Sequence, residues 1–134
     1  MLDGSRQKLC EGGFPSWATA SQWYIALMLG TWDKIATYAT TYEVATAYGY
    51  TQGGINISFT DSGTTTEKVT SATAMVWSAS GGSIVARYAA IYNKTTPYNI
   101  LCWCNLDSGL GDVTVTTGNT LTVTMNASGI FTLA

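Results

Sequence analysis

The stretch "GGSIVARYAAIYNKTTPYNILCWCN", residues 81–105, holds the longest strand candidate of the chain. Two glycines precede the apolar run 84–92, and "NKTTP" at 93–97 separates it from a second apolar run. Glycine readily takes the positive φ of turns, and Pro97 disfavours the interior of a strand. The stretch therefore predicts two strands joined by a turn.

Arg87 is one of only six cationic residues, yet it lies inside the apolar run. On a continuous strand its side chain would share a face with Val85 and Ala89. A lone buried cation is costly, so it must be paired or must reach the surface. Two interpretations follow: Arg87 pairs with a carboxylate, or it extends from an edge strand to water.

The remaining sequence predicts further short strands. Apolar and polar residues alternate in "INISFT" (55–60) and "NTLTVTM" (119–125), the period of a half-buried strand. Other candidates are "WYIALML" (23–29), "TTTEKVT" (64–70), "TAMVWS" (73–78), "VTVTT" (113–117) and "IFTL" (130–133). Turn residues recur at short intervals between them, as in a sandwich or jelly roll. We predict an all-β, antiparallel, jelly-roll-like β-sandwich over residues 23–134.

Two segments do not fit this pattern. Residues 1–22 contain Gly12, Gly13 and Pro15 and predict an irregular N-terminal arm. Residues 31–50 are ambiguous, because Trp32, Ile35 and Ala36 share a helical face while the Thr and Tyr content favours extended structure.

Charged residues make up 10% of the chain, hydrophobic residues 46%, and the net charge is −2. The scattered Lys and Arg residues argue against nucleic-acid binding, which needs clustered positive charge. The run "WYIALMLG" (23–30) is too short to span a bilayer. So few charges mean either an unusually neutral surface or one largely covered by partners.

Residues for common catalytic and metal sites are missing. The chain has no histidine, which removes the usual base of nucleophilic catalysis and a common metal ligand. The acidic residues sit mostly in predicted turns, and no phosphate-binding loop or spaced calcium loop is present. Cys102 and Cys104, two apart on one strand, are better placed as reduced thiols than as a disulfide. We expect no enzyme activity, no cofactor and no metal.

Aromatic residues concentrate between residues 32 and 50. In a small β-domain such rings fill the core, anchor a protein interface, or stack on sugars, and the sequence leaves all three open.

Three motifs carry a resemblance to a known family. They are "YEVATAYGYTQGG" (42–54), "MVWSASGGSIVARYAAIYN" (75–93) and "TLTVTMNASGIFTLA" (120–134). Their order resembles that of small structural proteins from the virion modules of tailed bacteriophages. The resemblance covers roughly residues 23–134, and "ILCWCN" (100–105) departs from it. The matching positions are Glu43, Val44, Gly49, Tyr50, Thr51, Gly53, Gly54, Trp77, Ile84, Ala86, Arg87, Tyr88, Ala89, Tyr92, Asn126, Gly129, Ile130 and Leu133.

The resemblance implies a non-enzymatic virion component, made in the bacterial host cytoplasm and located in the phage head. We expect a capsid cement or decoration protein that contacts the major capsid protein and copies of itself. The alternative is a tail, neck or surface module that contacts a host glycan. Candidate interface residues are Phe14, Trp17, Trp32, Tyr38 and Tyr42. Because Glu43 and Arg87 both belong to the resembling pattern, we predict that they form an ion pair.

Overall fold

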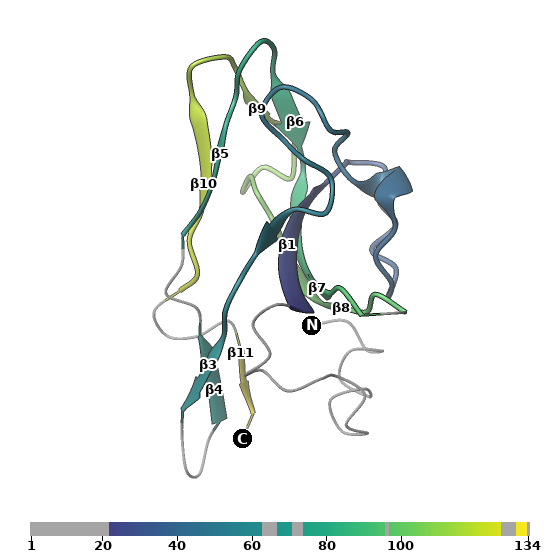
Figure 1. Cartoon of the computed structure of the whole chain (residues 1–134), viewed down its shortest axis with the longest axis vertical. Coiled ribbons are helices and arrows are strands. Elements are labelled where there is room, and N and C mark those ends of the chain that lie inside the picture. The colour runs from purple at the N-terminus through teal and green to yellow at the C-terminus, as the bar shows by residue number, and fades with distance from the viewer. Residues whose placement is uncertain (1–21, 63–66, 71–73, 96, 127–130, 134) are drawn as a thin grey trace.

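The computed structural model describes residues 22–62, 67–70, 74–95, 97–126 and 131–133 (Figure 1). These residues form antiparallel strands and one short 3-10 helix, η2 (Thr40–Tyr42), which confirms the predicted all-β class. In this part of the chain no helix is long and apolar enough to cross a membrane.

The central sheet has four strands in the order β2-β1-β7-β8. Its strands are β2 (Ile55–Asn56), β1 (Trp23–Met28), β7 (Tyr88–Asn93) and β8 (Ile100–Asn105). β1 and β7 pair along their whole length, from Trp23 opposite Asn93 to Met28 opposite Tyr88. β7 and β8 are the two strands predicted from residues 81–105, and a bulge shifts their register between Ile91 and Tyr92.

Both faces of the central sheet are covered, which explains its nearly continuous apolar strands. On one face Trp23, Ile25 and Leu27 of β1 belong to a core shared with Trp77 and Ile84. The other face carries a smaller cluster, whose buried residues are Ala26, Met28, Trp32, Tyr88, Ala90, Tyr92 and Ile100. Side chains on both faces of β1 and β7 are therefore buried.

The other strands form three small sheets. β5 (Met75–Ser78) pairs with β10 (Thr120–Val123), and β6 (Ile84–Ala86) pairs with β9 (Val113–Val115). β4 (Glu67–Thr70) lies between β3 (Thr60–Ser62) and β11 (Phe131–Leu133) at the lower end of the view in Figure 1.

Residues 31–50 are mostly irregular, and η2 is their only helical turn. The shared helical face suggested for Trp32, Ile35 and Ala36 is wrong, because Trp32 is buried while Ile35 and Ala36 are exposed. Backbone hydrogen bonds tie the segment to the sheet: the Leu29 N–H donates to the Tyr42 carbonyl, and the Val44 N–H donates to that of Leu27. Packing over the sheet, rather than local periodicity, determines this segment.

The alternating patterns correctly predict which side chains are buried. Ile57 and Phe59 are buried between exposed Asn56, Ser58 and Thr60, although regular pairing stops after Asn56. On β10, half-buried Leu121 and Val123 pack against the core. The period of two thus reports burial even where the ladder is interrupted.

Two glycines make the 42–54 segment possible. Gly49 and Gly54 have φ values of +93° and +70°. A Cβ on Gly49 would lie 2.0 Å from the Ser78 carbonyl oxygen, and one on Gly54 would lie 1.9 Å from that of Ile25. Only glycine allows both the conformation and the close backbone approach.

Candidate functional site

Arg87 lies at a break between two strands rather than inside one. The predicted strand 84–92 divides into β6 and β7, which pair with different partners on either side of Arg87. The Arg87 N–H donates to the Met28 carbonyl (2.9 Å), and the Arg87 carbonyl accepts from the Leu106 N–H (2.9 Å). The Arg87 side chain lies on the outward side with exposed Val85, while Ala86 and Tyr88 on either side of it are buried.

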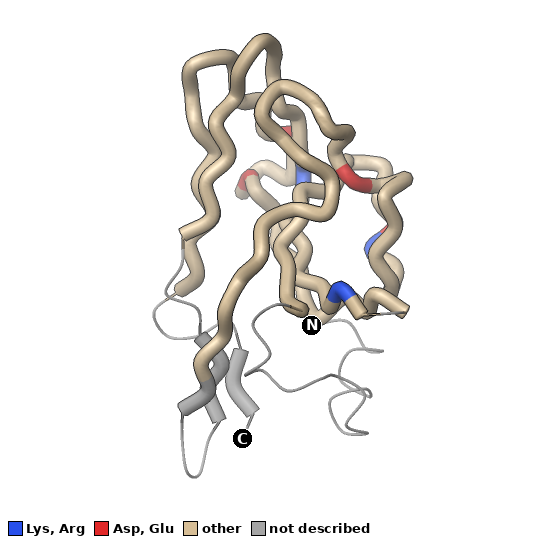
Figure 2. The backbone as a smooth tube through the Cα atoms, viewed as in Figure 1, with Lys and Arg blue, Asp and Glu red and all other residues tan. Residues whose placement is uncertain are grey.

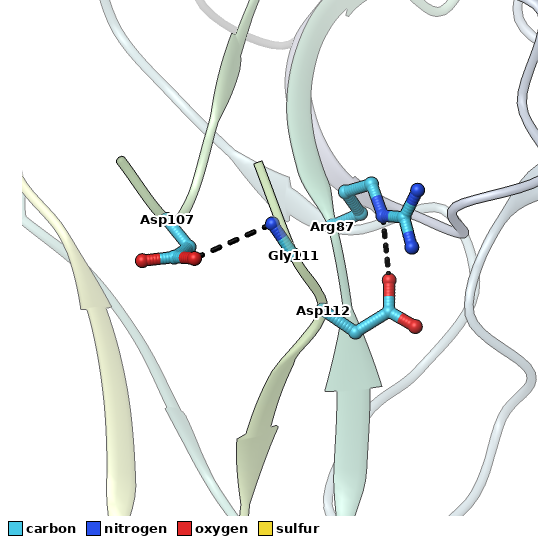
Figure 3. A network of polar contacts seen from close by, with 4 residues as sticks. All are labelled: Arg87, Asp107, Gly111 and Asp112. Atoms are coloured by element: carbon cyan, nitrogen blue, oxygen red, sulfur yellow. Dashed lines mark hydrogen bonds and ion pairs between the residues drawn. The ribbon is translucent and has the colours of Figure 1, made fainter. Parts of the chain in front are cut away.

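The Arg87 guanidinium pairs with Asp112, with Nε 2.7 Å from Oδ1 (Figure 3). The two side chains are 33% and 45% exposed. The hydrogen bond to Asp112 raises the pKa of Arg87, so the guanidinium stays charged. The predicted Arg87–Glu43 pair is therefore wrong. Arg87 does pair with a carboxylate, but the partner is Asp112 and both side chains are partly exposed.

The loop from Leu106 to Asp112 positions that carboxylate. The Gly111 N–H donates to Asp107 Oδ2 (3.3 Å), and the Leu110 N–H donates to the Asp107 carbonyl (3.1 Å). In Figure 3 the Asp107 carboxylate is joined to the Gly111 N–H and not to Arg87. Among the residues that the structure describes, no three His, Cys, Asp or Glu side chains gather as metal ligands.

Glu43 lies in a separate, buried site and is 2% exposed. Its Oε1 accepts hydrogen bonds from the Tyr50 hydroxyl (2.5 Å) and the Gly53 N–H (2.8 Å), and its Oε2 accepts one from the Tyr38 hydroxyl. The Tyr50 oxygen in turn accepts from the Leu27 N–H (2.9 Å), which connects the carboxylate to β1. We call Glu43, Tyr38, Tyr50 and Gly53 the Glu43 cluster.

Burial controls the protonation of this cluster. It raises the pKa of Glu43 above its ordinary value, and the hydrogen bonds from Tyr38, Tyr50 and Gly53 act in the opposite direction. Burial, together with the neighbouring Glu43 charge, also raises the pKa of Tyr38 and Tyr50. The tyrosines therefore remain hydrogen-bond donors at neutral pH.

A cavity of about 480 Å³ opens beside the Glu43 cluster. Tyr38 stacks on Tyr92, with ring centroids 4.0 Å apart and planes 7° apart, and meets Tyr98 edge-on at 6.5 Å. The Tyr92 hydroxyl donates to the Gly53 carbonyl (2.9 Å), which connects this wall to the 51–54 turn. The lining residues are Tyr38, Ala39, Thr40, Thr41, Gln52, Gly53, Tyr92, Lys94 and Tyr98, and we call this space the tyrosine cavity.

Two lysines lie over aromatic rings. Lys94, which lines the tyrosine cavity, has its Nζ 4.3 Å from the centroid of Tyr24. Lys34 has its Nζ 4.7 Å from Tyr88 and 5.4 Å from Trp103, outside the cavity. Among described side chains, neither ammonium has a carboxylate at ion-pair distance, since the pair found there is Arg87–Asp112.

The predicted interface residues separate into three groups. The prediction of Trp32 as an interface residue is wrong, because its side chain is 2% exposed and packs edge-on against Tyr88 and Trp103. Tyr38 and Tyr42 are half-buried. Phe14 and Trp17 lie outside the described residues.

The two described cysteines are free thiols, as predicted. Burial raises the pKa of Cys102 to about 12 and also raises that of Cys104. Because the thiolate is the nucleophile, these protonated thiols are poorly suited to covalent catalysis at neutral pH.

Sequence reasoning missed the actual partners of both charges. The sequence did not single out Asp112, and it marks Tyr50 and Gly53 only as positions in a motif. Their place in "YEVATAYGYTQGG", within ten residues of Glu43, was the available signal. No comparable signal links Lys94 and Tyr98 to Tyr38, because they meet only through the fold.

Comparison of the chain with protein-family models, curated proteins and solved structures finds no match.

Proposed function

We propose that this chain is a non-enzymatic structural protein of a tailed-phage virion, a cement or decoration protein that bridges major capsid subunits in the head. Its partners would be the major capsid protein and further copies of itself. For the architecture we propose a jelly-roll-like β-sandwich, residues 23–134, preceded by an arm, residues 1–22. The motif resemblance suggests the virion, and the open sheet edges described next support assembly.

The observation that carries the proposal is the absence of charge on four edge strands. Within the described residues β5, β10, β6 and β9 each pair with one strand, and the 48–49 loop meets the other edge of β5 only at its end, at Ser78 and Ser80. Their sequences, MVWS, TLTV, IVA and VTV, contain no charged residue and no proline. Proteins that remain monomeric usually protect such edges with charges, prolines, bulges, a covering segment or very short strands. These four strands are short, at three or four residues, but they carry neither charge nor proline. Uncharged open edges favour a protein whose neighbours cover them.

The surface agrees with this interpretation. Charged positions are few among the residues that Figure 2 colours. Large apolar side chains are exposed on the strands themselves, among them Val76 on β5 and Val85 on β6. Assembly would bury such neutral surfaces.

The motif positions described above also act structurally. Glu43, Tyr50 and Gly53 form a buried hydrogen-bond cluster, and Gly49 and Gly54 allow close backbone contacts. Arg87 pairs with a loop carboxylate. These contacts support a motif that maintains a fold rather than one that performs chemistry.

The direct test is the copy number of this chain in purified particles, measured by quantitative mass spectrometry against the major shell protein. A number comparable with that of the shell protein is expected for cement. A handful of copies would contradict the head location and indicate the tail or neck. Complete absence would overturn the virion assignment.

A variant tests the edge argument itself. Val76→Lys places a charge on β5, and we expect the protein to fold but to lose binding to shells that lack it. Leu110→Lys is the matched control, because Leu110 is also exposed but lies outside a strand. Equal binding by both variants would contradict edge-mediated assembly.

A second candidate function is a surface module that contacts a host glycan. The tyrosine cavity favours it, because aromatic rings and hydroxyl and amide groups line one concave surface. Under this alternative the chain would be a tail, neck or surface module.

A further inference from the structure

The tyrosine cavity has the size and composition of a small-ligand site. Its volume of about 480 Å³ lies within the range of roughly 300–1,000 Å³ typical of ligand pockets. Tyrosine rings provide apolar surface, and Thr40, Thr41 and Gln52 provide groups that both donate and accept hydrogen bonds. Such a combination suits a ligand with hydroxyl groups around an apolar face.

The rings form a corner rather than a closed stack. Tyr38 is covered on one side by Tyr92, while Tyr98 stands at 61° to it and is 40% exposed. The face of an aromatic ring is weakly negative and attracts positively polarised hydrogens. The C–H groups on one face of a pyranose ring are such hydrogens and can pack against it. Tyr98 is therefore the available stacking surface.

The charged groups at the cavity favour a negatively charged ligand. Lys94 is exposed at the cavity and interacts with the Tyr24 ring. The nearby acid is Glu43, which is buried and already accepts three hydrogen bonds. Its oxygens are thus occupied, whereas the ammonium has no carboxylate at ion-pair distance among described residues.

We propose that the tyrosine cavity binds an acidic sugar, with Tyr98 against the face of the ring and Lys94 paired with the sugar carboxylate. This inference names the ligand class of the second candidate function and rests on that candidate. It does not depend on where in a virion the chain is located.

The test uses the full ¹⁵N-labelled chain and NMR titration with methyl β-D-glucuronide, with methyl α-N-acetylneuraminide as a second acidic probe. Methyl β-D-glucoside is the neutral match, because it differs from the glucuronide only at C6. We expect amide shifts within residues 38–41, 52–53 and 92–94 and at Tyr98, and binding of the glucuronide roughly two- to five-fold tighter than that of the glucoside.

Matched variants separate charge from stacking. Lys94→Met, with Lys94→Gln as a second version, should remove the preference for the glucuronide, whereas Lys34→Met should retain it because Lys34 lies over other rings. Tyr98→Ala should weaken both sugars roughly three- to ten-fold. Tyr48→Ala is its control, because Tyr48 is also exposed and has a positive φ but does not line the cavity.

The outcomes distinguish the inference from the function beneath it. Equal binding of glucuronide and glucoside in the cavity would overturn the acidic ligand and leave a neutral glycan module. No cavity shifts with any of the three probes would overturn both. A preference that survives both Lys94 variants would overturn the role of Lys94.

Discussion

The Glu43 cluster and the Arg87–Asp112 pair are two different ways of accommodating a charge in a chain that has few. Glu43 is buried and is bound by neutral donors, two tyrosine hydroxyls and a backbone N–H. Arg87 is partly exposed and is bound by one carboxylate at the end of a loop. Each charge found local partners of a different kind instead of pairing with the other.

The two sites should differ in how much they contribute to the free energy of unfolding. A buried carboxylate that lost its donors, or donors that lost the carboxylate, would incur a desolvation penalty that water could not relieve. An exposed ion pair exchanges protein contacts for hydration at little net cost. We therefore expect changes near Glu43 to have large effects and changes near Arg87 to have small ones.

The largest effect is expected from Gly54→Ala, which disrupts the turn that supplies the Gly53 N–H to Glu43. The new Cβ would lie 1.9 Å from the Ile25 carbonyl oxygen, in a backbone at φ +70°. Both strain and clash must be relieved by backbone movement, so we expect a loss of about 3 kcal/mol or more in the free energy of unfolding. Urea unfolding followed by tryptophan fluorescence measures it.

Gly81→Ala is the matched control, because Gly81 has φ +71° but nothing within 4 Å of its Cβ position. Strain alone should cost about 1 kcal/mol there. Equal losses in the two variants would mean that the contact with β1 is unimportant.

Removal of the Glu43 carboxylate should be the next largest effect. Glu43→Ala leaves the Tyr38 and Tyr50 hydroxyls and the Gly53 N–H without their acceptor, at an expected cost of about 2–4 kcal/mol in the free energy of unfolding. Glu43→Gln retains one acceptor oxygen and should cost about 1 kcal/mol. Thermal and urea denaturation give both values.

Asp33→Ala provides the exposed comparison, and its effect should stay within about 0.5 kcal/mol. If Glu43→Ala were equally mild, the cluster would not contribute to stability.

The pH dependence sharpens the comparison further. Because burial raises the pKa of Glu43 in the folded state, protonated Glu43 adds stability below its unfolded pKa, and this contribution is lost as pH rises through the folded pKa. The stability of the wild type relative to Glu43→Gln should therefore decline with rising pH over the range above about pH 4, near which the unfolded carboxyl titrates. Urea titrations of both proteins across this range measure the difference. A difference that grows with pH would contradict the raised pKa.

The smallest effect is expected at the exposed pair. Arg87→Met and Asp112→Asn should shift the urea midpoint by no more than the scatter between replicates, because the ion pair is open to solvent. A double-mutant cycle between Arg87 and Glu43 should show no coupling, since their side chains lie in separate sites. Measurable coupling between them would revive the pair that the sequence suggested.

Much of the fold was predictable because its signals are local. Alternation at Ile57 and Phe59 reports burial, and the apolar run 88–92 with its turn and return strand predicts β7 and β8. The bend at Arg87 was not predictable in this way. The apolar run 84–92 predicts one strand. It divides at Arg87 because β6 pairs with β9 and β7 pairs with β1, and both partners are distant in sequence.

The candidate site was less predictable. Glu43 could be singled out through its motif, but its donors could not be assigned without knowing that residues 38–54 pack over the central sheet. Trp32 shows the same limit, because its sequence neighbours suggested an interface whereas its ring completes the second core cluster.

The sequence by itself determined the all-β class, the faces of its alternating strands and the lack of a histidine base, because each follows from composition or from a period of a few residues. Only the tertiary structure decided that Arg87 meets Asp112, that tyrosines hold Glu43, and that Tyr38, Lys94 and Tyr98 line one cavity. Such meetings depend on which distant strands pair and on where loops cross the sheet. The energies that select them are summed over the whole core rather than encoded in a short window.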